Sequence, residues 1–462
     1  MALTIEQNPL YTLNPVGQEV IFTALDASIV STYYKVKYIA EVHISTVDID
    51  LATSTALVGT FKTTPNNAGA GIFDFSSIVE SFVSPDNLAA SGSEYKLNSI
   101  SHPLHLTDKL SLNDNVVRYL KIRFKIEGST TATGNVELIE DSADSNQYTL
   151  FNGYLKHTDI LKLIAGDFGY EMLKFSMNSL EGQFLTNAPL NQYANIQDYG
   201  TLSFIATPNA AFPATTTVDE VAFKYYNSSG GTISAETISN VDANGGNTTW
   251  DSDAKNQLLH VGCFPANLQN WSASFASSMA LDLSYYTVRL LDSANADISQ
   301  TITININCPT KKGYEPIRLT WLNQWGAWDY YTFNMKSTKT ISTKGSTYQQ
   351  LEGTWNDSIY SPSGYKGGKK AFRVNATEKI SMNTDFVNEA ESEWFEELMN
   401  SPEVYILEGF ESTVSTTQLL NQYVTPARLT TSNFTRKTVA NDKLIQYTFE
   451  VEKSKILRTQ SV

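Results

Sequence analysis

The sequence predicts a mainly β protein made of several antiparallel β-sandwich domains. Two observations carry this prediction: apolar and polar residues alternate along many short stretches, and turn-rich tracts separate these stretches. In residues 34–44 the even positions are apolar and the odd positions are mostly polar, which is the pattern of a strand with one buried face. The tracts at residues 64–71, 227–231 and 242–247 are rich in Gly, Asn and Ser, as turns between strands are.

Four further strands follow along the chain with the same two-residue period. Side chains two residues apart lie on the same face of a strand, so each stretch has one apolar face that can join a core. The apolar positions are Leu120, Ile122, Phe124 and Ile126; Val221, Phe223 and Tyr225; Tyr286, Val288 and Leu290; and Ile302, Ile304, Ile306 and Cys308.

Helical patterns are few. A short helix is predicted after Ser76, which can cap it, and Ser84-Pro85 ends it. A longer helix is predicted over residues 385–400, where apolar residues recur at helical spacing and glutamates occupy other positions, and Pro402 stops it. The apolar positions of the longer helix are Val387, Ala390, Trp394 and Leu398.

We expect three domains. Residues 1–165 are predicted to form a β-sandwich-like domain with the short helix, and residues 166–310 a second one with long polar loops. Residues 311–462 are predicted to form a β-domain with a hairpin, a long loop over 338–370, a strand, one helix and three final strands. These final strands are expected over residues 404–407, 426–433 and 445–451.

Composition and charge exclude several classes of protein. Of the 462 residues, 41% are apolar and 18% are charged, which suits buried cores and argues against disorder. The net charge of −15 makes general binding to nucleic acid or anionic membranes unfavourable. No stretch approaches the ~20 apolar residues of a membrane span, and the first ten residues lack the features of a signal peptide. We therefore expect no sequence-specific nucleic-acid binding and no membrane insertion.

No metal or cofactor site is predicted. We interpret Cys263 and Cys308 as two buried thiols, with a disulfide between them as the alternative. His102 and His105 form a close pair, but no third ligand lies beside them, so a polar loop is the favoured interpretation. His43 falls on the polar face of its strand and is expected at the surface.

No catalytic motif is recognisable. The chain lacks a nucleophile elbow, a P-loop, a zinc-protease helix motif and a calcium-binding loop motif. Paired carboxylates are common in an acidic chain, so Asp48 and Asp50 do not indicate a glycosidase. We predict that the chain is not an enzyme, and a glycoside hydrolase on a β-sandwich is the least favoured hypothesis.

Residues 364–370, GYKGGKK, form a basic stretch that contains three glycines. The stretch follows no clear strand and opens no helix, so a flexible loop with a local positive patch is favoured over a phosphate-binding loop. Its candidate interface residues Tyr365, Lys366, Lys369 and Lys370 are expected to contact an acidic protein surface.

Residues 318–340 hold three of the seven Trp residues around one Gly. Apolar alternation on both sides of a Gly-centred turn predicts a hairpin, and it assigns the strand aromatics to a core. The turn leaves Trp325, Gly326, Trp328 and Asp329 as candidate contact residues. An exposed Trp pair could anchor an interface or stack on a sugar ring, and the turn could also fold back on its own sandwich. We interpret it as a contact between protein chains.

Several segments resemble virion structural proteins of tailed phages that infect Bacteroidetes, including crAss-like phages. The clearest is YEPIRLTWLNQWGAWDYYTFNMKST, although its Trp-Gly-Ala-Trp turn departs from the Gly-Gly of that pattern. The order of elements in residues 311–462 is also similar to that of tail-tube and distal-tail domains. The other segments that carry the resemblance are residues 15–24, 34–44, 69–84, 149–161, 401–408 and 424–452.

The resemblance implies a non-enzymatic structural component of a tailed phage virion. It implies a tail, collar or baseplate protein that forms a ring through loops and strand edges, with copies of itself and other virion proteins as partners. Its location would be the virion, after assembly in the bacterial host cytoplasm, and no cofactor is implied. The alternative function is a carbohydrate-binding adhesin or receptor-binding protein that uses an exposed Trp pair.

Overall fold

The protein is mainly β: of the residues that the structure describes, 49% are strand and 12% are helix, in several mainly antiparallel sheets, and this confirms the predicted fold class. The chain divides into two compact units: unit 1 is Met1–Asn307 with Leu322–Asp329, and unit 2 is Cys308–Trp321 with Tyr330–Val462. The division into three domains stays a prediction. The computed structural model describes residues 3–10, 12–90, 102–155, 160–164, 167–170, 182–206, 218–239, 257–292, 294–307, 313–362, 367–408, 423–436 and 445–458.

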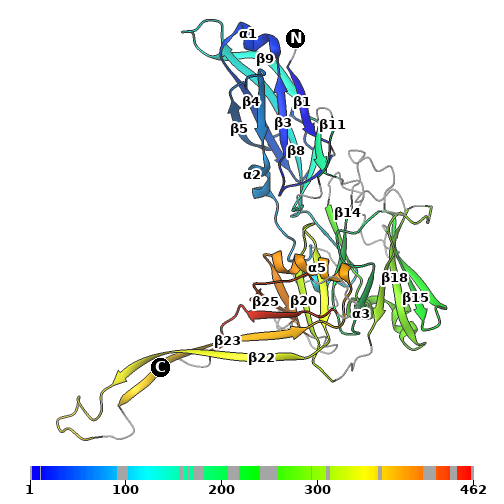
Figure 1. The fold of residues 1–462 in the computed structure, drawn as a ribbon, viewed down its shortest axis with the longest axis vertical. Coiled ribbons are helices and arrows are strands. Elements are labelled where there is room, and N and C mark those ends of the chain that lie inside the picture. The colour runs from blue at the N-terminus through cyan, green and yellow to red at the C-terminus, as the bar shows by residue number, and fades with distance from the viewer. Residues whose placement is uncertain are drawn as a thin grey trace. The chain divides into compact units, whose positions relative to one another are not determined.

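The first part of unit 1 is a sandwich of two sheets around one apolar core (Figure 1). Phe22, Tyr38 and Phe124 lie in this core, and Ala40 opposes Phe124 across the central strand pair. One sheet has the order β11 (Ile160–Ile164), β12 (Asp167–Tyr170), β1 (Thr4–Pro9), β3 (Ile21–Leu25) and β6 (Ala70–Asp74). The other has the order β2 (Leu13–Pro15), β10 (Tyr148–Phe151), β8 (Val117–Ser129), β4 (Tyr34–Ser45) and β5 (Leu57–Thr63), with β9 (Glu137–Asp144) also paired to β8.

Short helices accompany this sandwich. The sequence did not predict α1 (Ala27–Thr32), whose first turn is capped by the Asp26 carboxylate. The predicted helix after Ser76 is α2 (Ser76–Val79), continued by the 3-10 turn η1 (Glu80–Phe82). Its N-cap is Phe75, without a side-chain cap, so the prediction of a Ser76 cap is wrong. A second 3-10 turn, η2, covers Leu104–Leu106.

The second part of unit 1 has a five-stranded and a three-stranded sheet. The predicted strands around Phe223, Val288 and Ile304 are present as neighbours in the five-stranded sheet, whose order is β13 (Asn191–Ala194), β19 (Ile302–Ile306), β18 (Leu283–Leu291), β15 (Glu220–Asn227) and β16 (Thr232–Ser239). The three-stranded sheet has the order β14 (Thr201–Ala206), β17 (Gln257–Gly262) and β7 (Leu110–Asn113). Two helices that the sequence did not predict are α3 (Pro265–Trp271) and α4 (Ala273–Met279).

Unit 2 is built on one seven-stranded sheet and the helix α5 (Glu389–Asn400). Phe395 and Leu398 of this helix are fully buried, and Phe395 packs against Phe333 and Phe449 of the sheet. The helix begins after Asn388 and ends at Asn400, which agrees with the predicted interval 385–400 to within a few residues. The sheet order is β21 (Trp328–Phe333), β20 (Ile317–Leu322), β24 (Val404–Leu407), β25 (Val424–Leu429), β26 (Thr448–Lys453), β23 (Gly368–Asn383) and β22 (Ser337–Gln350).

The predicted long loop over residues 338–370 is wrong. This interval is mostly strand: β22 and the first residues of β23 form a long antiparallel hairpin, which runs away from the rest of the unit 2 sheet in Figure 1. Residues 337–350 show no apolar alternation, because β22 is almost wholly exposed and has no buried face.

Candidate functional site

The hairpin of β22 and β23, residues 337–383, is called the arm below. Along the described residues β22 pairs with β23 alone, and β26 supports β23 only over residues 379–383. One isolated bridge, from Ala376 to Leu457, adds a contact further out. A two-stranded hairpin without a packed face is marginally stable in water. The outer part of the arm therefore lacks the support that a ribbon of this length ordinarily has.

One face of the arm carries apolar side chains that are open to solvent. Val374 opposes Gly345 across the two strands, and Ile341 lies on the same face four residues before Gly345. Ile341 and Val374 are 62% and 42% exposed. Large β-branched side chains on an uncovered sheet face are typical of a surface that another molecule covers.

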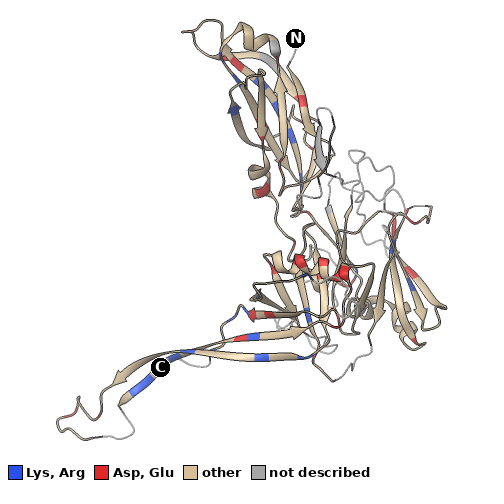
Figure 2. Ribbon diagram, viewed as in Figure 1, with Lys and Arg blue, Asp and Glu red and all other residues tan. Residues whose placement is uncertain are grey.

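The other face of the arm is polar and basic. Arg373 opposes Ser346, and Lys344 lies two residues from Ser346 on the same face. Further out, Lys369 and Lys370 begin β23. Figure 2 shows the basic residues along the arm. Within the described part of the chain, Lys344, Lys369, Lys370 and Arg373 have no ion-pair partner.

The end of the arm is a small apolar knob, residues 351–362. Four of its large apolar side chains are more than half exposed: Leu351, Trp355, Ile359 and Tyr360. Burying one such side chain contributes about 2 kcal/mol of favourable free energy, so covering the knob with another molecule would be favourable.

Local hydrogen bonds hold the knob in one shape. The Thr354 hydroxyl donates to the Ile359 carbonyl at 2.9 Å and accepts from the Ser361 amide at 2.8 Å. The Trp355 indole nitrogen donates to the Glu352 carbonyl at 2.7 Å, and its ring lies edge-on to Tyr360 with centroids 5.5 Å apart. The apolar side chains are thus displayed on an ordered loop, which lowers the entropy lost when a partner binds.

Two of the predicted basic interface residues lie in this arm. Lys369 and Lys370 are on a strand, where Gln349 and Tyr348 oppose them, so their assignment to a flexible loop is wrong. Lys369 is exposed and Lys370 is half-buried. The other two predicted residues, Tyr365 and Lys366, lie outside the described residues.

The turn of the aromatic hairpin is buried, so the prediction of an exposed Trp pair is wrong. Trp325 and Trp328 are 1% and 2% exposed. Gly326 has a φ of +75°, and a Cβ at this position would lie 2.2 Å from the Asn152 carbonyl oxygen. Trp325 and Ala327 join a core cluster within unit 1. The turn is therefore a plug in its own unit, an outcome that strand alternation left open.

One asparagine organises this plug. The side-chain oxygen of Asn323 accepts from the amides of Trp325 and Ala327 at 3.0 and 3.1 Å. Its nitrogen donates to the Leu185 carbonyl at 2.8 Å and to Asp329 at 3.0 Å. Asp329 also accepts from another hydroxyl of unit 1 at 2.6 Å. Asp329 is therefore a structural acceptor here and is not displayed at the surface.

A buried Ser–His–Asp group, which the sequence did not predict, lies in the same unit. The Ser203 hydroxyl is 2.7 Å from Nδ1 of His260, and Asp86 is 3.3 Å from its Nε2. The side chains of His260 and Asp86 are completely buried and Ser203 is nearly so. The Asp86 carbonyl accepts from the Trp328 indole at 2.7 Å. Because all three side chains are covered, we interpret the group as a polar network that holds the plug.

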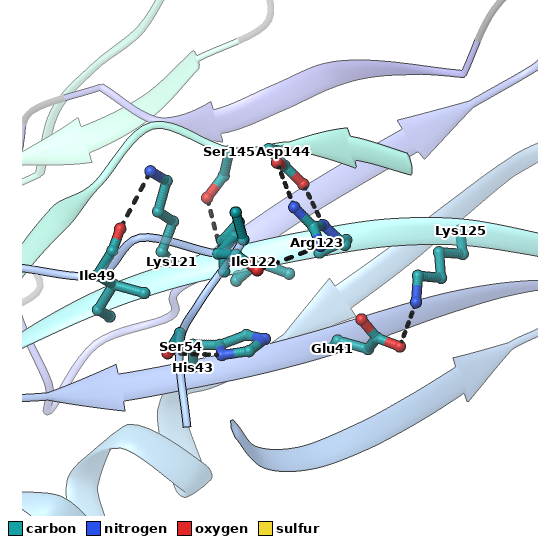
Figure 3. Close-up of polar contacts among 12 residues, drawn as sticks. Glu41, His43, Ile49, Ser54, Lys121, Ile122, Arg123, Lys125, Asp144 and Ser145 are labelled. Carbon is teal, nitrogen blue, oxygen red and sulfur yellow. Dashed lines mark hydrogen bonds and ion pairs between the residues drawn. The ribbon is translucent and has the colours of Figure 1, made fainter. Parts of the chain in front are cut away.

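The other predicted histidines and one cysteine are also buried. His43, expected at the surface, is only 6% exposed, and its Nδ1 is 3.3 Å from the Ser54 hydroxyl (Figure 3). Burial lowers the pKa of His43. His102 and His105 are buried and do not form the predicted polar loop. Cys263 is buried as predicted, whereas Cys308 lies outside the described residues.

The face of the β4–β8 strand pair that carries His43 also carries ion pairs. Nε of Arg123 donates to Asp144 at 2.7 Å and Nη2 donates to its second oxygen at 2.9 Å, so the pair is bidentate (Figure 3). This hydrogen bonding lowers the pKa of the Asp144 carboxyl. Lys125 donates to Glu41 at 2.6 Å on the neighbouring strand. These pairs have their acceptors within the sandwich, in contrast to Lys344 and Arg373 of the arm.

Comparisons with known proteins add no family. No family model matches the chain, and no curated protein matches it. Among the described residues there is no cluster of three metal-ligating side chains, and no helix there is long and apolar enough to cross a membrane.

Proposed function

We propose that this protein is a non-enzymatic structural component of a tailed phage virion, in the tail, collar or baseplate. The observation that carries the assembly role is the arm: an exposed two-stranded ribbon that ends in a knob of large apolar side chains. Such a ribbon gains stability and loses exposed apolar surface when a neighbouring molecule covers it. The resemblance of several segments to phage virion proteins supports the particular assembly.

Ring formation follows the same physical logic. The outer edge of β22 is unpaired among the described strands, so its backbone groups are free to pair with another chain. In a ring around a channel, a net charge of −15 would repel DNA and let it pass without sticking. Copies of this chain and other virion proteins are the proposed partners, and the virion is the proposed location.

The test is to find the chain in particles. Peptide mass spectrometry of purified virions of the encoding virus should detect the chain in many copies, and a virion reconstruction should place it in a ring. Comparison with a host protein of similar abundance in the lysate controls for contamination. If purification removes the chain from the particles to the same extent as the host protein, the result contradicts the proposal.

The adhesin hypothesis loses its proposed site. It needed Trp325 and Trp328 at the surface, and both indoles are buried in unit 1. A sugar ring cannot stack on either face without unfolding the plug. Glycan binding that survives Trp355→Ala would also exclude the exposed Trp of the knob as a sugar platform.

A further inference from the structure

We propose that the arm docks on the acidic surface of a second copy of this chain, with Trp355 of the knob as its apolar anchor. This inference rests on the proposed assembly function and names the contact and the partner. The arm is the donor surface, and the acceptor is the body of the next copy, meaning all residues outside 337–383. Two observations carry it independently: the charge of the arm and the apolar chemistry of its end.

The charge of the arm is opposite to that of the rest of the chain. Residues 337–383 contain seven Lys and Arg and three Asp and Glu, a net charge of +4 in a chain whose net charge is −15. All other residues together therefore carry −19. Lys344 and Arg373 share one face and have no ion-pair partner in the described structure. A second copy supplies the complementary charge without any other protein.

The knob supplies the short-range part of the contact. Trp355 is 68% exposed and is held in place by the Glu352 carbonyl and the ring of Tyr360. Ordered aromatic side chains that become fully covered are the residues that dominate binding at protein interfaces. Leu351 and Ile359 lie in the same knob and enlarge the apolar area around the indole.

A protein partner is favoured over nucleic acid. Lys and Arg beside exposed aromatic rings can bind a nucleic acid, but a body with a charge of −19 repels phosphates over a wide range. The same body attracts the basic arm of another copy. The aliphatic side chains of Ile341 and Val374 on the opposite face also suit a protein surface better than a phosphate backbone.

The contact has a defined symmetry class. The donor and the acceptor are different surfaces, so each copy uses one of each and the contact is head-to-tail. A head-to-tail contact produces a closed ring when the rotation between copies closes, and an open chain when it does not. With the ring proposed above, this contact predicts assemblies larger than a dimer; a rotation of 180° between copies would instead close it as a dimer that exchanges arms.

The experiment is sedimentation velocity of the full chain over a range of protein and salt concentrations. We expect the wild type to form multimers whose association weakens as salt increases, because the charge contact is screened, while the apolar contact of the knob remains. Trp355→Ala and the pair Lys344→Glu with Arg373→Glu should each weaken association at least about tenfold. The loss caused by Trp355→Ala should persist at high salt, whereas the charge variant should differ from wild type mainly at low salt.

Matched controls are present in unit 1. Tyr193 is an exposed aromatic residue on β13, and Lys37 is an exposed lysine on β4. Tyr193→Ala and Lys37→Glu should leave association unchanged. All substituted side chains are at the surface, so each variant should fold. Far-UV circular dichroism checks that each variant keeps the secondary structure of the wild type.

Each outcome decides a different proposal. Arm variants that associate like the wild type overturn the docking inference. A chain that is monomeric at all concentrations but is found in virions overturns self-docking and leaves the virion proposal standing. Self-association through the arm in a chain that is absent from virions overturns the virion proposal and leaves self-docking standing. Salt-dependent binding of a DNA duplex that the charge variant abolishes, without self-association, would assign the arm to nucleic acid instead.

Discussion

Gly326 occupies a position where both backbone conformation and space require glycine. Its φ of +75° lies in the left-handed region, and the Asn152 carbonyl stands where a Cβ would go. The residues around it form the plug of unit 1. A single added methyl group therefore tests whether the plug contributes to stability.

We expect Gly326→Ala to lower the free energy of unfolding of unit 1 by about 3 kcal/mol, from backbone strain and the clash together. Urea unfolding followed by Trp fluorescence measures this change. Gly230→Ala is the matched control in unit 1, because Gly230 also has a positive φ, +80°, but its Cβ position meets only the Tyr285 hydroxyl, at an ordinary 3.8 Å. It should cost only about 1 kcal/mol. Equal effects of the two substitutions would show that the plug is not closely packed.

The Arg123–Asp144 pair predicts a pH dependence. The hydrogen bond with Arg123 lowers the pKa of Asp144, so the pair stabilises the folded state above the unfolded pKa of about 4 and loses this contribution as pH falls through the folded pKa. Both side chains are partly exposed, so Asp144→Asn should cost no more than about 1 kcal/mol at pH 7. Urea midpoints should converge for the two proteins below about pH 3. A difference that is constant from pH 3 to pH 7 would assign the effect to something other than this titration.

At the scale of elements, α5 has a complete capping box. The Asn388 side chain accepts from the Glu391 amide at 2.8 Å, and the Glu391 carboxylate accepts from the Asn388 amide at 2.8 Å. The helix places Trp394 and Phe395 on the aromatic core of unit 2. Its start therefore matters for the whole unit.

Asn388→Ala should lower the stability of unit 2 by about 1 kcal/mol, because the amide of Glu391 loses its acceptor. The thermal unfolding midpoint measures the loss. Asn388→Asp keeps an acceptor at the same place and should stay close to the wild type. A loss equal to that of the alanine variant would mean that the cap is not what stabilises the helix start.

The outer part of the arm has no covered face: β22 is exposed along almost its whole length, and the buried residues of the arm, Ile380 and Met382, lie at its base. In the unassembled protein we expect the amides of β22 to exchange with deuterium much faster than those of β24, because β24 lies between two strands in the same sheet. In assembled particles the β22 amides should become protected. Hydrogen exchange with mass spectrometry measures both states, and β24 is the internal control. Unchanged exchange in the particles would show that the arm is not covered on assembly.

At the scale of the whole molecule, sequence neighbours belong to different units. Residues 322–329 belong to unit 1, although residues 308–321 and 330–462 on both sides of them belong to unit 2. Trp325 and Ala327 share a core cluster with Phe151 and Leu258. A boundary near residue 310, as the sequence predicts, would separate this core cluster from its plug.

A chain that ends at residue 307 should therefore unfold at a lower urea concentration than unit 1 of the full chain, because removing the buried Trp325 leaves a cavity worth about 3 kcal/mol or more. It should also bind a dye for exposed apolar surface. A peptide of residues 318–333 added to the fragment should reduce dye binding. A fragment as stable as the full-length unit would show that the plug is dispensable.

The amino-acid sequence alone predicts the β-rich fold class, the strands with one apolar face and the α5 interval, because period-two and helical alternation record which faces are buried. It also identified the aromatic hairpin and the basic residues Lys369 and Lys370. The burial of the turn at Trp325 and Trp328 depends on tertiary contacts, since Asn152 and Leu185, which contact the turn, are far away in the sequence. Only the tertiary structure revealed the arm, because a strand without a buried face leaves no alternation to detect.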